Sequence, residues 1–389
     1  MNEVLFPRLG WSIPVTETAF TVFGIEIKWY AIIITTGIFL AWVYVTKNAR
    51  KVGLHPDNVF DVIFGGVIGG VVGARLYYVL FEGNLSYYIQ NPLEIFNTRA
   101  GGLAFYGGLI GGLLVGIIVA WRKKLNVFPL LDLVGPAFLI GQSIGRWGNF
   151  VNEEAFGANT NLPWGMTSSK IQLVLTNMKK NMGAAGASID PTQPVHPCFL
   201  YESIWCAIGF FVLNAYRKKR KFDGDVFLLY LAWYGFGRFF IEGLRMDSLY
   251  WGPFRVSQVL SALLFAGALI VRFIILQKIK KDPAKYPLYK DTEKSKEIMQ
   301  ATDEKLAKGK KAKEDLSDPE VSKKVDEQNA EEVGEVLDLE DGNPLDEENR
   351  EESSEIPMMD IGSVMVGEEE ISRKEDQEEA AEEREKDSF

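Results

Sequence analysis

The stretch GRWGNFVNEEAFG, residues 145–157, combines residue types that neither a membrane span nor an apolar core requires. It follows a long apolar run and contains Arg146, Asn149, Asn152 and Glu154 together with three glycines. A guanidinium group binds phosphate through paired hydrogen bonds, amides bond to hydroxyl groups, and a carboxylate can accept a proton. These residues indicate a site that holds a phosphate group and stabilises its charge as it leaves.

Other common kinds of catalytic site are not supported. The chain has two histidines, His55 and His196, which excludes zinc motifs of the HExxH type and histidine-rich metal clusters. The one match to the GxSxG pattern of serine hydrolases, GQSIG at 141–145, lies at the end of an apolar run rather than on a strand-to-helix turn, so a serine hydrolase of that type is not supported. Cys198 and Cys206 lie eight residues apart on one predicted helix, which favours small packing residues over a disulfide or metal site. We expect neither a metal nor another cofactor.

The net charge of −10 over 389 residues hides two different parts. Residues 1–281 carry 26 Lys and Arg against 16 Asp and Glu, whereas residues 282–389 carry 16 against 36. The second part has too little apolar content to form a packed core, so we expect a disordered acidic tail from residue 282, with short helices at most. Basic residues of the first part occur in short clusters between apolar runs, which does not suggest nucleic-acid binding.

The first part contains seven apolar segments of about the length that crosses a bilayer. Backbone groups in lipid must be hydrogen-bonded internally, so these segments are predicted to be helices. The predicted fold class is an all-α integral membrane protein with seven transmembrane helices. The predicted spans are Trp29–Val45, Val59–Phe81, Leu103–Trp121, Val127–Ile144, Phe199–Ala215, Val226–Ile241 and Val256–Leu276.

Clusters of Lys and Arg follow the first, third, fifth and seventh spans, as in RKKRK at 217–221. Because such clusters mark the cytoplasmic side, the N-terminus is predicted to lie outside and the C-terminus inside. Residues 1–28 then form an extracytoplasmic arm, residues 29–281 the seven-helix domain, and residues 158–197 an extracytoplasmic loop or small head.

This topology brings polar residues of separate spans to one depth, the outer half of the membrane. An arginine at the bilayer centre costs about 2.5–3.5 kcal/mol on insertion scales, so Arg75, Arg146 and Arg238 need a reason to be there. A lipid phosphate is one reason, and pairing with Glu154, Glu202 or Glu242, or reaching to the headgroups, is the alternative. The other polar residues expected at this depth are Tyr30, Tyr106, Glu202, Glu154 and His196.

Simpler interpretations are favoured for several other features. We expect Arg272, near the inner end of the seventh span, to reach to the headgroups or to pair with a glutamate, and Asp61 and Asp132 to be helix-end or interhelical partners. The glycine repeats GGVIGGVVGA (65–74) and GGLIGG (107–112) favour close helix packing rather than a phosphate-binding loop.

The stretch 145–157 resembles the complete signature of the bacterial prolipoprotein diacylglyceryl transferases. Its fixed positions are Gly145, Arg146, Gly148, Asn149, Phe150, Asn152, Glu154 and Gly157. Blocks similar to the family's occur in the same order over about residues 20–277: GARLYYVLF (73–81), GGLAFYGGLIGG (101–112), HPCFLYES (196–203) and YGFGRFFIEGLR (234–245). The resemblance implies a seven-helix enzyme of the bacterial cell membrane with its active site toward the outer leaflet. Such enzymes transfer the diacylglyceryl group of phosphatidylglycerol to the lipobox cysteine of preprolipoprotein signal peptides and release glycerol phosphate.

Residue roles are implied by the same resemblance. Arg146 and Arg238 would bind the headgroup phosphate, with Arg75 and Gly157 also at the lipid site, while Asn149 and Asn152 would bond the glycerol hydroxyls. Glu154 would orient Arg146 or receive a proton, Glu242 would position Arg238 from one helical turn away, and Arg245 would guide substrate at the outer mouth. Tyr30 matches a tyrosine of the family's site.

Tyr106 departs from the family pattern, because many members have histidine there. Tyrosine has an unperturbed pKa near 10, so Tyr106 is a poor general base. We expect the arginines to favour ionisation of the substrate thiol and Tyr106 to position substrate.

Two other functions are compatible with parts of the sequence. Arginines in a helical bundle also occur in transporters or flippases for an anionic lipid or solute, although no continuous polar path leads inward beyond Asp61 and Asp132. A membrane scaffold acting through its acidic tail is the third interpretation, and the intact signature argues against it.

Overall fold

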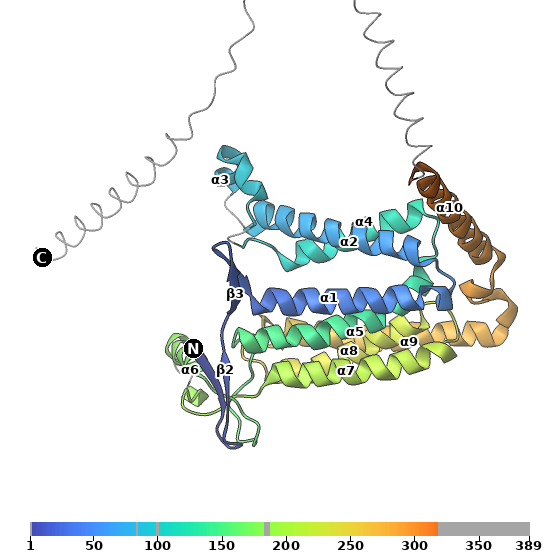
Figure 1. Ribbon diagram of the computed structural model, residues 1–389. Coiled ribbons are helices and arrows are strands. Elements are labelled where there is room, and N and C mark those ends of the chain that lie inside the picture. Colours follow the sequence, from blue (N-terminus) through green and yellow to red (C-terminus); the bar gives the residue numbers. More distant parts are fainter. Residues whose placement is uncertain (1, 83–84, 99–100, 183–186, 318–389) are drawn as a thin grey trace, which may run out of the picture. The chain divides into compact units, whose positions relative to one another are not determined.

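The computed structural model describes residues 2–82, 85–98, 101–182 and 187–317. The chain divides into two units, residues 1–309 and 310–389. Seven long helices of the first unit coincide with the seven predicted segments (Figure 1). They are α1 (Trp29–Asn48), α2 (Pro56–Tyr77), α4 (Phe105–Arg122), α5 (Val127–Val151), α7 (Cys198–Tyr216), α8 (Asp225–Leu244) and α9 (Val256–Lys281).

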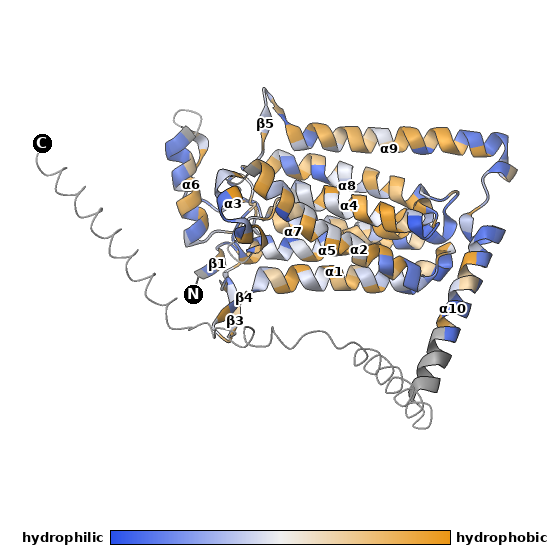
Figure 2. Cartoon of the chain, turned by 90° about the horizontal axis from the view of Figure 1, so that it is seen from above, coloured by the Kyte–Doolittle hydropathy of each residue, from blue (hydrophilic) through white to orange (hydrophobic). Residues whose placement is uncertain are grey.

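Five helical segments within the described ranges are long and apolar enough to cross a membrane: those containing α1, α2, α5, α7 and α9. The other two long helices fall short for identifiable reasons. The apolar part of α4 is shorter, and α8 contains Asp225, Arg238 and Glu242 within 20 residues. Apolar residues cover much of these helices (Figure 2). The chain is therefore a mostly helical integral membrane protein.

Short strands and helices complete the first unit. The strands are β1 (Asn2–Phe6), β2 (Trp11–Val15), β3 (Thr18–Val22), β4 (Ile25–Lys28), β5 (Tyr250–Trp251) and β6 (Phe254–Arg255), which pair antiparallel as β1–β2, β3–β4 and β5–β6. A π-helical turn (Tyr78–Glu82) continues α2 and leads to α3 (Leu85–Gln90) and the 3₁₀ helix η3 (Pro92–Phe96), and α6 (Ser169–Met182) precedes α7. The expected fold class was all-α, and these three β-hairpins correct that prediction. The strands were not predicted because their residues form no long apolar run.

The N-terminal arm and the segment before α7 form one small body, which we call the head (residues 2–28, 157–182 and 187–197). Leu5 of β1 exchanges backbone hydrogen bonds of 2.8 and 2.9 Å with Thr167. Apolar side chains of β1, α6 and the ends of α5 and α7 share one buried cluster, which includes Val4, Ile171 and Phe199. The end of α5, which carries GRWGNFVNEEAFG, thus lies against the head. We call this end of the helix bundle the head end.

Helices α2 and α4 pack through glycines. A Cβ on Gly69 would lie 2.7 Å from the Gly111 oxygen, and one on Gly111 would lie 2.9 Å from the Gly73 Cα. Such close backbone approach is possible only for residues without a side chain. The prediction that the glycine repeats serve helix packing is confirmed.

Buried carboxylates set the position of α8 relative to α5. Asp132 of α5 accepts hydrogen bonds from the backbone nitrogens of Gly224, Val226 and Phe227, at 3.0, 2.8 and 3.2 Å. These N–H groups begin α8 and have no partner within the helix. Arg272 pairs with Asp225 at 2.7 Å, and Asp61 pairs with Lys123. The three residues therefore have structural partners. The sequence predicted this for Asp61 and Asp132, and the carboxylate that pairs with Arg272 is an aspartate rather than a glutamate.

The segment after α9 does not begin as a disordered tail. It forms the 3₁₀ helices η6 (Pro283–Lys285) and η7 (Tyr289–Asp291) and then α10 (Glu293–Ser317). Tyr289 joins the buried cluster of the α1–α2 turn, and the buried Ser295 hydroxyl donates to the Gly53 carbonyl at 2.7 Å. The expectation of disorder from residue 282 is wrong for this part, because a few apolar and small residues in a charged sequence suffice to dock it; residues 318–389 lie outside the described ranges.

An ionic contact reinforces this docking. Asp303 of α10 accepts from Arg50 and contacts His55, both at 2.9 Å. These contacts lower the pKa of the Asp303 carboxyl to about 2, so it remains ionised at neutral pH. The contacts join α10 to the α1–α2 turn, at the end of the bundle that carries the Lys and Arg clusters, which we call the basic end.

We expect two truncations of the predicted tail to differ in their effect on thermal stability. Removal of residues 310–389 leaves the thermal unfolding midpoint in detergent within about 2 °C of the full chain, because it removes none of these contacts. Removal of residues 283–389 exposes the α1–α2 turn, and loss of about 2 kcal/mol lowers the midpoint by about 5 °C. Equal midpoints for the two truncations would contradict the docking.

Candidate functional site

The C-terminal end of α5 carries the first group of site residues. The helix continues to Val151, beyond the predicted end at Ile144, and closes with a left-handed residue, Glu153, at φ 52°. The Glu154 N–H donates to the Asn149 carbonyl, and the Glu153 N–H donates to the Phe150 carbonyl, both at 3.0 Å. This is the Schellman arrangement, which usually has glycine at the left-handed position.

The turn directs the Glu154 side chain back toward the helix. Its Oε1 accepts hydrogen bonds from the amides of Asn149, at 2.9 Å, and Asn152, at 3.3 Å. Asn149 in turn accepts from Arg146 Nη1 at 3.1 Å. Glu154 is therefore linked to Arg146 through Asn149, an arrangement compatible with the expected orienting role.

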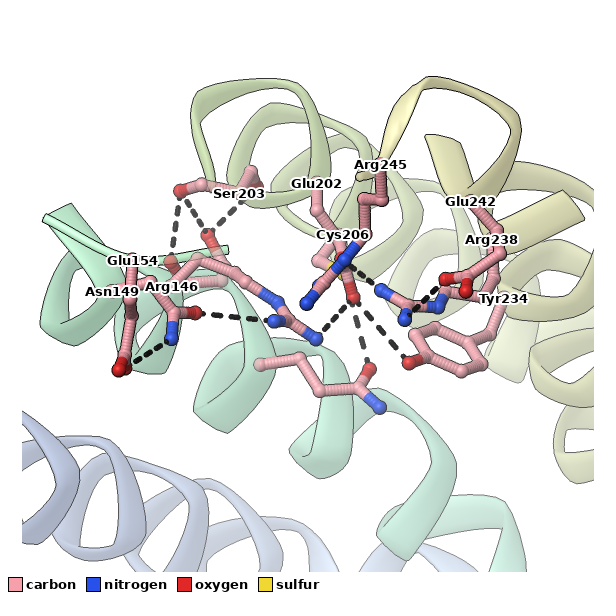
Figure 3. Close-up of polar contacts among 12 residues, drawn as sticks. Arg146, Asn149, Glu154, Glu202, Ser203, Cys206, Tyr234, Arg238, Glu242 and Arg245 are labelled. Carbon is pink, nitrogen blue, oxygen red and sulfur yellow. Dashed lines mark hydrogen bonds and ion pairs between the residues drawn. The ribbon is translucent and has the colours of Figure 1, made fainter. Parts of the chain in front are cut away.

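Glu202 of α7 lies between the two arginines (Figure 3). Its Oε1 accepts from Arg146 Nη2 at 2.6 Å, and its Oε2 accepts from Arg238 Nη1 at 3.0 Å. The whole Glu202 residue is 2% exposed, while the side chains of Arg146 and Arg238 are 22% and 15% exposed. A buried carboxylate thus joins guanidinium groups from α5 and α8, and both arginines remain partly accessible.

A second carboxylate balances the charge. Arg238 Nη2 pairs with Glu242 Oε2 at 2.6 Å, one helical turn along α8, as the spacing predicted. The Tyr234 hydroxyl also donates to Glu202, at 3.4 Å. Two arginines and two glutamates give this cluster no net charge. We call Arg146, Glu202, Arg238 and Glu242 the arginine–glutamate cluster.

Two tryptophans hold α7 and α8 beside this cluster. The indole N–H of Trp205 donates to the Trp233 carbonyl at 3.0 Å, and that of Trp233 donates to the Trp205 carbonyl at 3.1 Å. Their rings stack with centroids 4.4 Å apart. Trp205 lies three residues after Glu202 on α7, and Trp233 lies five residues before Arg238 on α8. The tryptophan contact therefore fixes the position of Glu202 relative to Arg238 along the helix axes.

Gly157 and Arg245 lie where the head meets the end of α8. Gly157 donates its N–H to the His196 carbonyl at 2.9 Å and pairs with Arg245 as an isolated β-bridge. A Cβ on Gly157 would lie 2.8 Å from the His196 Cβ and 2.9 Å from the Cys198 sulfur, so a side chain does not fit there. Arg245 donates to Asp247 at 2.8 Å. Burial lowers the pKa of His196, which favours its neutral form.

Tyr30 is in the first turn of α1 and lies against the same part of α5. A Cβ on Gly148 would lie 2.7 Å from Tyr30 Cδ2, so the tyrosine ring packs on this glycine, two residues after Arg146. The signature glycine therefore makes room for Tyr30.

Arg75 and Tyr106 lie on the α2–α4 pair. The Arg75 guanidinium donates to four backbone carbonyls and contacts no residue of the arginine–glutamate cluster. Tyr106 is in the first turn of α4 and is largely exposed. The structure thus brings together the predicted site residues of α1, α5 and α8. Arg75 instead donates its hydrogen bonds to backbone carbonyls of the segment between α2 and α4.

Glu202 is the residue that the sequence analysis considered only as a possible ion partner. The available signal was a carboxylate inside an apolar helix, in HPCFLYES, at the depth of two arginines. A buried acid of that kind requires compensating cations. That requirement could have placed Glu202 in the site.

Known proteins similar to this chain were found in two ways. A family model described as prolipoprotein diacylglyceryl transferase matches residues 17–274. A protein of Enterococcus faecalis (strain ATCC 700802 / V583) is 46% identical over 260 residues, which are 66% of this chain and 89% of that protein. It is named phosphatidylglycerol–prolipoprotein diacylglyceryl transferase.

Other relatives with the same name cover a similar part of the chain. The protein of Clostridioides difficile (strain 630) is 42% identical over 266 residues, 68% of this chain and 98% of its own length. That of Staphylococcus haemolyticus (strain JCSC1435) is 41% identical over 273 residues, 70% of this chain and 92% of its own.

We expect Glu202→Gln to destabilise the protein, because it leaves the mostly buried Arg146 guanidinium without a carboxylate. Removing one partner of a buried ion pair costs about 3–5 kcal/mol. Thermal unfolding in detergent measures this effect. The control is Glu293→Gln, which removes an exposed contact with Lys296 on α10 and leaves the midpoint unchanged within error. An unchanged midpoint for Glu202→Gln would show that the carboxylate is dispensable for the fold.

Proposed function

The chain belongs to the prolipoprotein diacylglyceryl transferase family, and we propose that its arginine–glutamate cluster is the site where phosphatidylglycerol binds and reacts. The observation that carries this proposal is that Glu202 holds the guanidinium groups of Arg146 and Arg238 side by side at one end of the bundle. The relatives' names supply the donor and acceptor, a phosphatidylglycerol and a prolipoprotein.

The two arginines bind the phosphodiester of the lipid. Each guanidinium has five N–H donors, and the contacts with Glu202, Glu242 and Asn149 use two on each. The remaining donors are available for phosphate oxygens. Asn149 and Asn152 bond the glycerol hydroxyls, Glu154 keeps the two amides in place, and Gly157 and Arg245 line the approach from the head.

The reaction forms a thioether. The sulfur of the prolipoprotein cysteine attacks the glycerol carbon that carries the phosphate ester, a C–S bond forms, and the C–O bond breaks. The electron pair of that bond leaves with glycerol phosphate, and the thiol proton passes to a base. The additional negative charge on the departing phosphate falls beside Arg146 and Arg238, which stabilise it. The same positive groups favour the ionised form of a thiol whose ordinary pKa is about 8.5.

Membrane orientation follows the distribution of basic residues. We propose that all seven long helices span the bacterial cell membrane, with the N-terminus outside, so that the head end and the cluster lie at the outer leaflet. The acceptor is then the lipobox cysteine of a signal peptide on that side. Transport is less well supported, since Asp61 and Asp132, the two candidates for a path inward, are engaged by Lys123 and by N–H groups that begin α8.

The direct test combines the purified full chain with phosphatidylglycerol and a synthetic lipobox peptide. Mass spectrometry is expected to detect a diacylglyceryl adduct on the peptide cysteine, together with free glycerol phosphate. Movement of labelled lipid between leaflets with no adduct would instead identify a flippase.

Arg146→Ala is expected to reduce kcat/KM by about 100-fold or more, because a charged donor to the developing phosphate charge is lost. Arg146→Lys retains the charge but not the paired hydrogen bonds, so its rate lies between those of Arg146→Ala and the unsubstituted protein. Arg122→Ala, at the basic end, is the matched control and retains full activity. A fully active Arg146→Ala would exclude the proposed phosphate site.

Tyr106→Phe is expected to lower the rate less than Arg146→Ala does, by about 10-fold, since we propose that Tyr106 positions substrate through one hydrogen bond. The pH–rate profile should keep its shape, because no titrating base is removed. A loss as complete as that of Arg146→Ala, or a changed pH profile, would assign Tyr106 the role of the base.

A further inference from the structure

Arg75 makes an unusual set of contacts near the end of α2. The residue is 8% exposed. Its guanidinium donates to the carbonyls of Glu94 at 2.7 Å, Ile95 at 2.8 Å, Gly102 at 2.9 Å and Gly101 at 3.4 Å. All of its hydrogen bonds among the described residues go to backbone carbonyls. The side chain therefore fixes the backbone path of residues 94–102 rather than the position of another side chain.

These carbonyls need such a partner. Two belong to Glu94 and Ile95 near the end of η3, where helix carbonyls run out of N–H donors within the helix. The Glu94 carbonyl also accepts from the Asn97 N–H at 3.2 Å. A cation at a helix C-terminus is also favoured by the helix dipole. The guanidinium carbon lies 5.4 Å from the Tyr88 ring centroid and 5.7 Å from that of Tyr78, which adds cation–π contacts. Arg75 therefore fixes α3 and η3 against α2.

The opposite side of this segment is apolar and exposed. Ile89 is 72% exposed, Leu93 is 83% exposed and Phe96 is 82% exposed. Leu85 and Ile89 are four residues apart on α3, and Leu93 and Phe96 are three residues apart on η3, so each pair shares one face of its own helix. We call these four residues the α3–η3 apolar face.

Two observations indicate what covers this face. Between residues 85 and 98 the one charged residue is Glu94, whose carboxylate accepts from Asn97. The preceding π-helical turn continues α2 with Leu80 and Phe81, both exposed, so the apolar face continues the lipid-facing surface of a membrane helix. Weakly charged segments with aromatic residues at the end of a span are typical of the membrane–water interface.

We propose that Arg75 is a positioning residue that holds the α3–η3 segment so that Ile89, Leu93 and Phe96 enter the lipid interface at the head end of the bundle. The occupant of the face is the boundary between headgroups and acyl chains of that leaflet. The segment is thereby a lipid-binding surface separate from the arginine–glutamate cluster, and Arg75 reaches it through backbone carbonyls rather than by binding a phosphate.

Site-specific fluorescence tests the lipid contact. Cys198 and Cys206 are buried, and replacing both with alanine leaves a single introduced cysteine for an environment-sensitive dye. The full chain is placed in nanodiscs with and without lipids brominated near the headgroup. Leu93→Cys and Phe96→Cys are expected to be quenched at least about twofold more than Asn91→Cys, a polar exposed position of the same segment. Equal quenching at the three positions would overturn the lipid contact.

Arg75→Gln tests the clamp in the same assay. It is expected to reduce quenching at position 93 to the level at position 91, while Arg75→Lys, which retains a donor, recovers part of the difference. Undiminished quenching in a folded Arg75→Gln protein would refute the positioning role. Protection of position 93 only after addition of a signal peptide would assign the face to a peptide rather than to lipid. If Arg75→Gln does not fold, undiminished quenching in Arg75→Lys, which cannot reach four carbonyls, refutes the role equally.

Discussion

The site depends on one carboxylate shared by two guanidinium groups. Arg146 and Arg238 lie on two different helices, α5 and α8, and two mostly buried cations held side by side repel each other. Glu202 supplies the intervening negative charge from a third helix. The same contact therefore joins α5, α7 and α8 and holds the two arginines side by side, the arrangement on which the proposed phosphate site rests.

Much of the surrounding structure maintains this contact. The reciprocal tryptophan bonds set α7 against α8, and Asp132 sets the beginning of α8 against α5. These two restraints act at different heights of α8, so the helix can neither slide nor rotate freely relative to the carboxylate. Under the proposed function, a phosphate meets donors that are already arranged, which reduces the entropic cost of binding and of stabilising the charge that develops later.

The long helices and the gathering of Arg146, Asn149, Glu154, Arg238 and Glu242 could be predicted because hydropathy and helix direction are local properties. Contacts between segments that are distant in the sequence could not be predicted. The residues next to Arg75 in the sequence do not indicate that its guanidinium would bind four backbone carbonyls. Likewise, Tyr289 and Ser295 occur in a charged sequence. They are buried because they pack against the α1–α2 turn around Gly53, which is more than 230 residues away in the sequence. The head hairpins were missed because short strands depend on the partner strand more than on their own composition.

The docking of α10 also concerns the order in which the protein is made. The α1–α2 turn emerges from the ribosome early, yet it packs against Tyr289, Ser295 and Asp303, which are synthesised more than 230 residues later. Chains are made from the N-terminus and fold progressively during synthesis. The first helical hairpin must therefore reside in the membrane with its turn uncovered until the last span has been inserted, and completion of α10 marks the moment at which the oldest part of the chain reaches its final packing.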